Sequence, residues 1–209
     1  MRKMLGIKFT DRLQHFESAL SSGVFTDENQ KVCHPDNAIK NILNELLELQ
    51  KAGKSVFLIG NGGSAAVASH ITNDLCNMGR VRAGALNDLA TLTCYANDYG
   101  YEEIYARQIK NVAQPGDVLF AISSSGGSEN IVRAAAEMIA CGGTLFTLSG
   151  FRSNNPLRTM GRINFWLDSC EYGIVEIGHL FFLHHIANIF SEISADQSAA
   201  DTELFGLTQ

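Results

Sequence analysis

The chain contains the stretch Ser55-Val56-Phe57-Leu58-Ile59-Gly60-Asn61-Gly62-Gly63-Ser64, in which an apolar run leads into a glycine-rich loop. Residues 117–128 repeat this arrangement, because an apolar run there ends in Ser123-Ser124-Ser125-Gly126-Gly127-Ser128. Each segment predicts a buried strand, a turn of small residues and then a helix. Such a turn directs backbone N–H groups and the positive end of the helix dipole at one place. We therefore expect each loop to bind an anion, most often a phosphate.

Short apolar segments alternate with helical patterns from residue 55 onward, which predicts a parallel sheet with helices on both faces and right-handed crossovers. The predicted strands are 55–60, 83–87, 117–122, 143–149 and 163–167. The predicted helices between and after them are 64–78, 88–96, 101–113, 128–141 and 173–195. The predicted fold class is α/β, a five-stranded parallel sheet in a flavodoxin-like three-layer sandwich.

The first fifty residues carry two amphipathic segments, 9–20 and 35–53, which predict an N-terminal helical hairpin. We expect one structural domain, in which residues 1–53 pack as helices on a core formed by residues 54–195. Residues 196–209 are predicted to be a polar tail.

The composition narrows the class of protein. Apolar residues make up 45% of the chain and charged residues 18%, which is typical of a globular protein with a large core. The net charge of −6 disfavours nucleic acid as a partner. We expect no membrane span, because no run of eighteen apolar residues occurs, and no signal peptide. Five scattered cysteines indicate neither a zinc ribbon nor a disulfide framework, so we expect a cytoplasmic protein.

The two loops are rich in hydroxyl groups that can donate to phosphate oxygens, from Ser64, Ser123, Ser125 and Ser128. Helix capping is the alternative, because serine is a favoured N-cap residue and glycine a favoured turn residue. Two such loops at equivalent strand ends favour binding. Neither loop holds Lys or Arg, so neutral donors would bind a small phosphorylated metabolite. The dinucleotide glycine spacing and the Walker A lysine are both missing, which disfavours nucleotides.

A second group of candidate residues lies on two predicted helices. His70 and Asp74 are four residues apart and share a helix face. On the last helix, Glu176 and His184 are eight residues apart, and His179 is three residues after Glu176. One imidazole and one carboxylate from each helix can hold a divalent metal or act as an acid/base pair. A surface ion pair on each helix is the alternative.

Residues 97–103 combine a helix break with acidic side chains. They can form an ordinary acidic first turn of a helix. If the loop turns inward, Asp98 can instead orient a sugar hydroxyl.

Taken together, these segments resemble the sugar isomerase (SIS) domain family and, within it, the phosphoheptose isomerases. The resemblance is carried by residues 60–66, 96–103, 122–128 and 172–184 and covers nearly the whole chain. It implies that residues 54–195 form a SIS domain with a five-stranded parallel sheet. It also implies a homotetramer with active sites between subunits.

The resemblance assigns roles to matching residues of this chain. It places the sugar phosphate at the hydroxyls of Ser64, Ser123, Ser124, Ser125 and Ser128, and in the loop of Gly62 and Gly63. Asn61 and Asp98 fall where the family contacts the sugar. It places one zinc ion per subunit at His70, Asp74, Glu176 and His184. Asp74 and His184 are the expected proton-transfer residues.

Two positions depart from the family pattern. Asp74 stands where the family usually has Glu, and Glu176 stands where it usually has Gln. The shorter side chain of Asp74 loses about 1.5 Å of reach, and a displacement of about 1 Å in a catalytic group can cost roughly a hundredfold in rate. Glu176 adds a negative charge, which favours a bound divalent cation.

The resemblance predicts a metal-dependent aldose–ketose isomerase. Its expected reaction converts sedoheptulose 7-phosphate to D-glycero-D-manno-heptose 7-phosphate through an enediolate, on the route to heptose for lipopolysaccharide or capsule. An alternative is a non-catalytic SIS-domain protein that binds sugar phosphates or associates with a replication initiator. Isomerisation of a pentose or hexose phosphate is a third reading.

Overall fold

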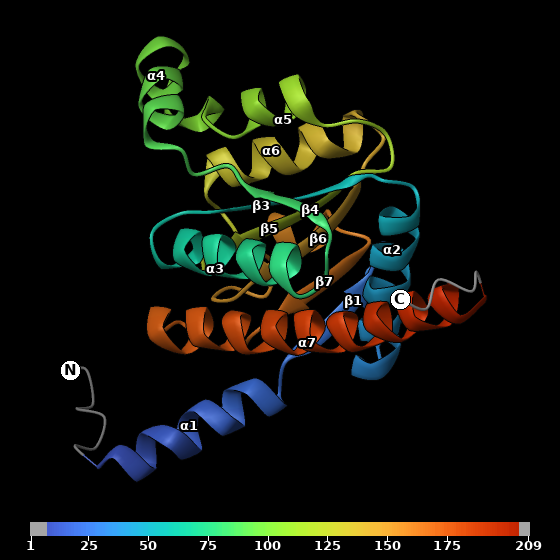
Figure 1. The fold of residues 1–209 in the computed structure, drawn as a ribbon. Coiled ribbons are helices and arrows are strands. Elements are labelled where there is room, and N and C mark those ends of the chain that lie inside the picture. The colour runs from blue at the N-terminus through green and yellow to red at the C-terminus, as the bar shows by residue number, and fades with distance from the viewer. Residues whose placement is uncertain (1–7, 205–209) are drawn as a thin grey trace, which may run out of the picture.

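The computed structural model of the chain describes residues 8–204, and only the backbone of residues 196–204 (Figure 1). The elements in chain order are α1 (Phe9–Ser21), β1 (Val24–Asp27), β2 (Val32–Cys33), α2 (Pro35–Lys51), β3 (Ser55–Gly60), α3 (Gly63–Asn77), β4 (Arg82–Ala85), α4 (Leu89–Tyr99), η1 (Tyr101–Glu103), α5 (Ala106–Val112), β5 (Val118–Ser123), α6 (Glu129–Ala140), β6 (Thr144–Ser149), η2 (Leu157–Thr159), β7 (Ile163–Trp166) and α7 (Tyr172–Leu204).

The sheet has seven strands in the order β2-β1-β7-β6-β5-β3-β4. The five predicted strands are all present, and they pair in parallel as β4-β3-β5-β6-β7. β1 and β2 extend the sheet at the β7 edge, where β1 runs antiparallel to both neighbours. The predicted parallel sheet is therefore confirmed as the centre of a larger mixed sheet.

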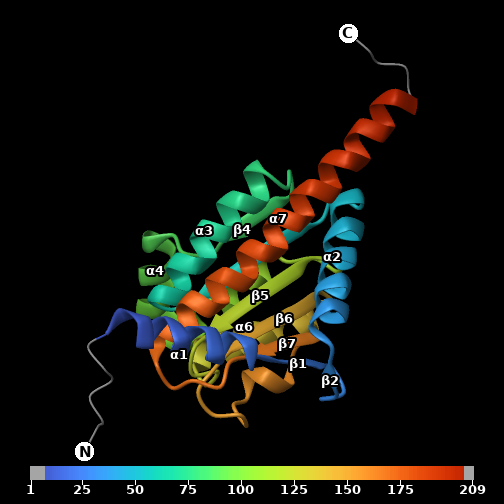
Figure 2. The same cartoon turned by 90° about the horizontal axis from the view of Figure 1, so that it is seen from below.

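Helices cover both faces of the sheet in three layers (Figures 1 and 2). α2, α3 and α7 bury one apolar cluster against the sheet, and α5 and α6 bury a second cluster on the opposite face. β5 contributes side chains to both clusters: Phe120 and Ile122 belong to the first cluster, while Leu119 and Ala121 belong to the second. A strand alternates its side chains between faces, so a strand buried on both faces reads as a continuous apolar run.

The N-terminal helices are both present, but the predicted helical hairpin is wrong. The β1–β2 hairpin connects them, and α1 packs on α7 rather than against α2. Phe25 of β1 stacks on Phe165 of β7 with ring centroids 4.6 Å apart. The Asp27 side chain closes the turn by accepting from the backbone N–H groups of Asn29 and Lys31. The sequence pattern did not predict this hairpin, because the β-forming segment is short and β1 pairs with β7, which lies far away in the sequence.

α7 is longer than the sequence predicts, because the helical backbone continues through residue 204 into the expected polar tail. Residues 205–209 of that tail lie outside the described residues. By length and composition Tyr172–Ala195 could cross a membrane, yet half of its most apolar window is buried inside the fold. α7 packs along α3 and α2 and belongs to the core (Figure 2).

Candidate functional site

The two predicted anion loops meet at one edge of the sheet. β3 and β5 are neighbours, but the chain moves from β3 towards β4 and from β5 towards β6, in opposite directions across the sheet. In open α/β sheets, ligands bind in the crevice between two neighbouring strands from which the chain continues in opposite directions. Here the crevice is a pocket of about 260 Å³, lined by Asn61, Gly62, Gly63, Ser64, Ser123, Ser124, Ser125, Ser128, Tyr172 and Glu176.

The loop after β3 is held in a shape that requires glycine. Gly62 has φ +55°, and a Cβ on Gly60 would collide with the backbone of Ser64. The Tyr105 hydroxyl donates to the Gly60 carbonyl at 2.5 Å. Burial raises the pKa of Tyr105 to about 12, so this donor stays protonated at physiological pH. The glycine pattern therefore reflects backbone geometry that brings the start of α3 to the pocket.

The serine hydroxyls are not used for helix capping. Ser128 is the N-cap residue of α6 but makes no side-chain capping hydrogen bond, and the N-cap residue of α3 is Gly62 rather than Ser64. The buried Ser124 hydroxyl has no hydrogen-bond partner among the described residues. A buried hydroxyl without a partner is unfavourable unless a ligand supplies one. These donors fit a phosphate group.

Glu176 lies in the same pocket. A Cβ on Gly63 would collide with the Glu176 carboxylate, so that carboxylate rests against the first residue of α3. The positive end of the helix dipole favours a negative group there. A carboxylate and the serine hydroxyls therefore share one small space.

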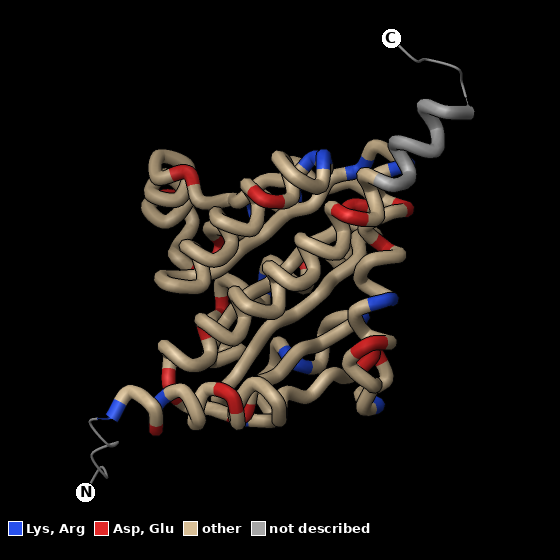
Figure 3. The backbone as a smooth tube through the Cα atoms, turned by 60° about the horizontal axis from the view of Figure 1, so that its bottom comes forward, with Lys and Arg blue, Asp and Glu red and all other residues tan. Residues whose placement is uncertain are grey.

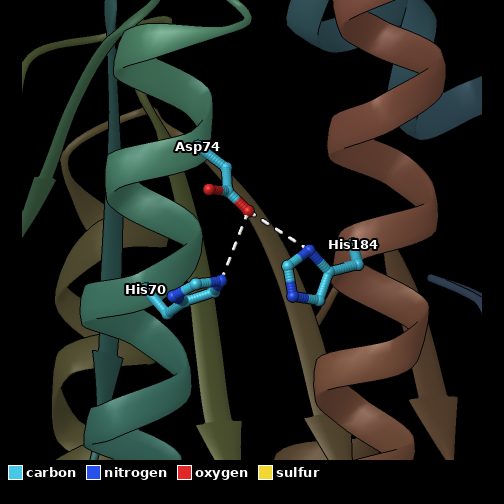
Figure 4. Close-up of side chains that lie close together, drawn as sticks. All are labelled: His70, Asp74 and His184. Carbon is cyan, nitrogen blue, oxygen red and sulfur yellow. Dashed lines mark ion pairs between the residues drawn. The ribbon is translucent and has the colours of Figure 1, made fainter.

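The second group of predicted residues comes together between α3 and α7 (Figure 4). Candidate ligand atoms of His70, Asp74 and His184 all lie within 4.8 Å of one another. Asp74 Oδ2 is 3.6 Å from His70 Nε2 and 3.2 Å from His184 Nδ1. The Asp74 side chain is mostly covered, while both imidazoles are more open.

These three residues fit a divalent metal. Two imidazoles and one carboxylate form a typical three-ligand catalytic zinc set, and donors about 2 Å from a tetrahedral ion lie about 3.3 Å apart. α3 and the segment 172–195 contain no Lys or Arg. Figure 3 accordingly shows no basic position along these two helices. No fixed positive charge on either helix therefore opposes a cation in this groove.

Two predicted site residues lie elsewhere. Glu176 is outside the group of three, because eight residues of α7 place it about 12 Å from His184 along the helix axis. Asp98 is exposed on α4, where it accepts from the Asn97 side chain at 2.9 Å. Within this single chain, Asp98 lines neither the serine pocket nor the neighbouring pocket around Tyr101.

Sequence reasoning missed three residues around the loop. Asn130 of α6 exchanges two hydrogen bonds with Asn61, and the Tyr101 hydroxyl donates to Asn61 Oδ1 at 3.0 Å. Tyr101 also lines a second pocket of about 470 Å³ on the other side of this loop. Tyr172 lines the serine pocket. The sequence offered no signal for Asn130 beyond an asparagine two residues after Ser128, because its burial and its contact with Asn61 appear only in the structure.

His179 takes no part in either group. It is fully buried, and its Nε2 lies 3.1 Å from the Ser149 carbonyl oxygen. Burial lowers its pKa to about 4, so the ring is neutral at physiological pH.

Comparisons with known proteins agree with this geometry. The family described as SIS domain matches residues 29–150, which include both loops and the His70–Asp74 pair. The chain belongs to the SIS domain family. Its match ends before α7, so the family pattern itself does not cover Glu176 and His184.

Similar proteins within the SIS family include phosphoheptose isomerases. One from Mycobacterium bovis is 35% identical over 156 residues, which cover 72% of this chain and 79% of the relative. One from Campylobacter concisus is 33% identical over 148 residues, which cover 68% of this chain and 78% of the relative. The structure of a phosphoheptose isomerase from Francisella tularensis superposes with a TM-score of 0.74 at 27% identity, covering 89% of this chain and all of that one.

Proposed function

We propose that this protein is a phosphosugar isomerase of the aldose–ketose type. One observation carries the proposal: α3 begins at the phosphate pocket and bears His70 and Asp74 further along. Those residues lie roughly 10 to 16 Å from Gly63 along the helix axis. A sugar phosphate bound by its phosphate at the serine loop would extend towards them. The phosphoheptose isomerase relatives support the same class of reaction.

The proposed chemistry moves one proton between adjacent sugar carbons through an enediolate. Both imidazoles contact Asp74 Oδ2, which leaves Oδ1 to accept the proton next to the carbonyl. His184 would deliver or shuttle the proton at the neighbouring carbon. The contact with Asp74 orients the His184 ring for that role.

His70, Asp74 and His184 would hold one divalent ion per chain, zinc by family resemblance. Such an ion, when bound, supplies Lewis-acid polarisation of the sugar carbonyl and hydroxyl. The residues of this chain bind the phosphate, orient the sugar and transfer the proton. Glu176 lines the phosphate pocket and is not one of these ligands.

The proposed substrate is sedoheptulose 7-phosphate, with D-glycero-D-manno-heptose 7-phosphate as product. This choice rests on the substrate class in the names of the relatives and on the distance along α3 between the phosphate pocket and the Asp74 group. We also propose a cytoplasmic homotetramer that associates with neither nucleic acid nor membrane.

Turnover of sedoheptulose 7-phosphate by the purified chain tests the proposal. We expect Asp74→Asn and His184→Gln each to lower kcat by roughly a hundredfold or more, because each removes an acid/base group. His185→Gln is the matched control, since His185 is the exposed neighbour of His184. Elemental analysis should find about one divalent ion per chain in the wild type and less in both active-site variants. A wild-type chain that binds the sugar phosphate without turning it over would contradict an isomerase and indicate a binding protein.

A further inference from the structure

Asn61, at the tip of the loop after β3, is held by a reciprocal amide pair. Its Nδ2 donates to Asn130 Oδ1 at 3.0 Å, and Asn130 Nδ2 donates back to Asn61 Oδ1 at 2.9 Å. Asn130 is 2% exposed and lies in the first turn of α6, directly after the serine loop. The pair therefore ties the two phosphate loops to each other.

The hydrogen bonds of Asn61 leave one N–H group of its side chain free to donate. An asparagine side chain has two acceptor lone pairs and two N–H donors. Asn61 Oδ1 accepts from Asn130 and from the Tyr101 hydroxyl at 3.0 Å, so its acceptor capacity is filled. One N–H donates to Asn130, and the other has no partner among the residues that the structure describes. Asn61 lines the serine pocket, where that N–H can meet a ligand.

Asn130 holds the plane of the Asn61 amide. If the Asn61 amide rotated alone, it would oppose like atoms of Asn130 and leave a buried donor and acceptor unpaired, so the two amides can only rotate together. The Asn61 side chain is therefore held at the pocket by a residue that does not itself line the pocket.

We propose that Asn130 is a positioning residue that holds Asn61 at the pocket, where the free N–H of Asn61 donates to the bound phosphosugar. The inference rests on the proposed function for the ligand class but not for turnover. A donor-only Asn61 favours an ionised phosphate or a sugar oxygen over a ligand group that must donate. Neutral donors from both loops then surround the anion without a basic side chain.

A double-mutant cycle tests the proposal, using inorganic phosphate and sedoheptulose 7-phosphate as probes in calorimetry. Asn130→Leu keeps the side-chain size, stays uncharged and cannot hydrogen-bond to Asn61. We expect it to weaken binding of both probes by about tenfold. In an Asn61→Ala background the same change should alter binding by less than about twofold, because the group through which it acts is gone. Asn111→Leu, at an exposed amide that donates to the Tyr95 hydroxyl, is the matched control and should leave binding unchanged.

Thermal midpoints of the ligand-free variants separate positioning from stability. Equal weakening by Asn130→Leu with and without Asn61 would overturn the proposal, as would a loss of stability with unchanged affinity. If Asn130→Leu does not fold, Asn130→Ala takes its place in the same cycle, because it is also uncharged and lacks the amide. It should weaken binding with Asn61 present and have little effect in Asn61→Ala, and equal effects would overturn the proposal. Phosphate binding needs no turnover, so the result stands apart from failure of the isomerase assay.

Discussion

At the scale of single residues, burial separates the candidate catalytic histidines, His70 and His184, from His179. His70 and His184 lie with Asp74 at partly open positions, whereas His179 is fully buried, with its Nε2 near the Ser149 carbonyl oxygen and its ring edge-on to Phe165. His179 and His184 are only five residues apart on α7, so the difference between them comes from burial. Only the solvent-accessible pair can exchange protons with a substrate.

The neutral His179 predicts a pH-dependent stability. The unfolded chain takes up a proton at this histidine near pH 6.5, while the folded chain takes it up only near pH 4. The free energy of unfolding should therefore fall as the pH drops from about 6.5 to about 4, with no further loss from this group below that. The loss should reach about 2 kcal/mol by about pH 5.

Urea unfolding at about pH 7.5 and about pH 5 measures this effect. In His179→Gln, which cannot titrate, the drop between the two pH values should be smaller by about 2 kcal/mol. In His185→Gln, at an exposed position, it should match the wild type. An identical drop in His179→Gln and the wild type would show that His179 does not cause it.

At the scale of elements, two helix ends meet at the phosphate pocket. The Glu176 carboxylate, on the second turn of α7, rests against the first residue of α3, where a phosphate would also benefit from the helix dipole. No basic residue lines the pocket. The two anions therefore oppose each other in a space of about 260 Å³.

Removing the Glu176 charge should strengthen phosphate binding. Repulsion between like charges near a protein surface is of order 1 kcal/mol or more, so Glu176→Gln should raise the affinity for inorganic phosphate by about fivefold. Glu192→Gln removes the same charge at an exposed site further along α7 and should change little. Calorimetry with added chelator measures both. Weaker binding in Glu176→Gln would instead indicate that Glu176 accepts a hydrogen bond from the ligand.

At the scale of the whole molecule, an apolar surface on α1 and α7 supports assembly. Ile177 and Phe181 lie one turn apart on α7 and are 56% and 59% exposed, and Phe9 of α1 is 73% exposed. A groove of about 250 Å³ between α1, α2 and α7 contains Phe181 and Phe182. Exposed apolar groups concentrated on adjoining helices are typical of an interface.

Placing a charge on this surface should break the proposed tetramer. Phe181→Glu should shift the mass in light scattering from about four chains towards smaller species, because a carboxylate in an apolar interface loses its solvation. Ile139→Glu is the matched control, because Ile139 is an exposed residue of α6 on the opposite face of the sheet. It should keep the wild-type mass. A wild-type monomer, or an unchanged tetramer in Phe181→Glu, would contradict an interface on this face.

The strand-loop-helix segments and the alternation after residue 55 were readable from the sequence because they depend on local patterns. An apolar run of six residues, a glycine at φ +55° and a helix start follow from neighbours along the chain. The same holds for the pairing of His70 with Asp74, which helix geometry places on one face. These local features determined the parallel sheet and its phosphate loops.

Other features were decided only by the tertiary structure, because they join segments far apart in the sequence. The β1 strand is stabilised by its pairing with β7, and the sequence pattern around residues 24–27 did not predict it. Packing of α7 on α3 assigns His184 to the Asp74 group and Glu176 to the phosphate pocket. Asn130 meets Asn61 across sixty-nine positions, because β3 and β5 are adjacent. Local chemistry set which groups the chain offers, and long-range packing set which of them meet.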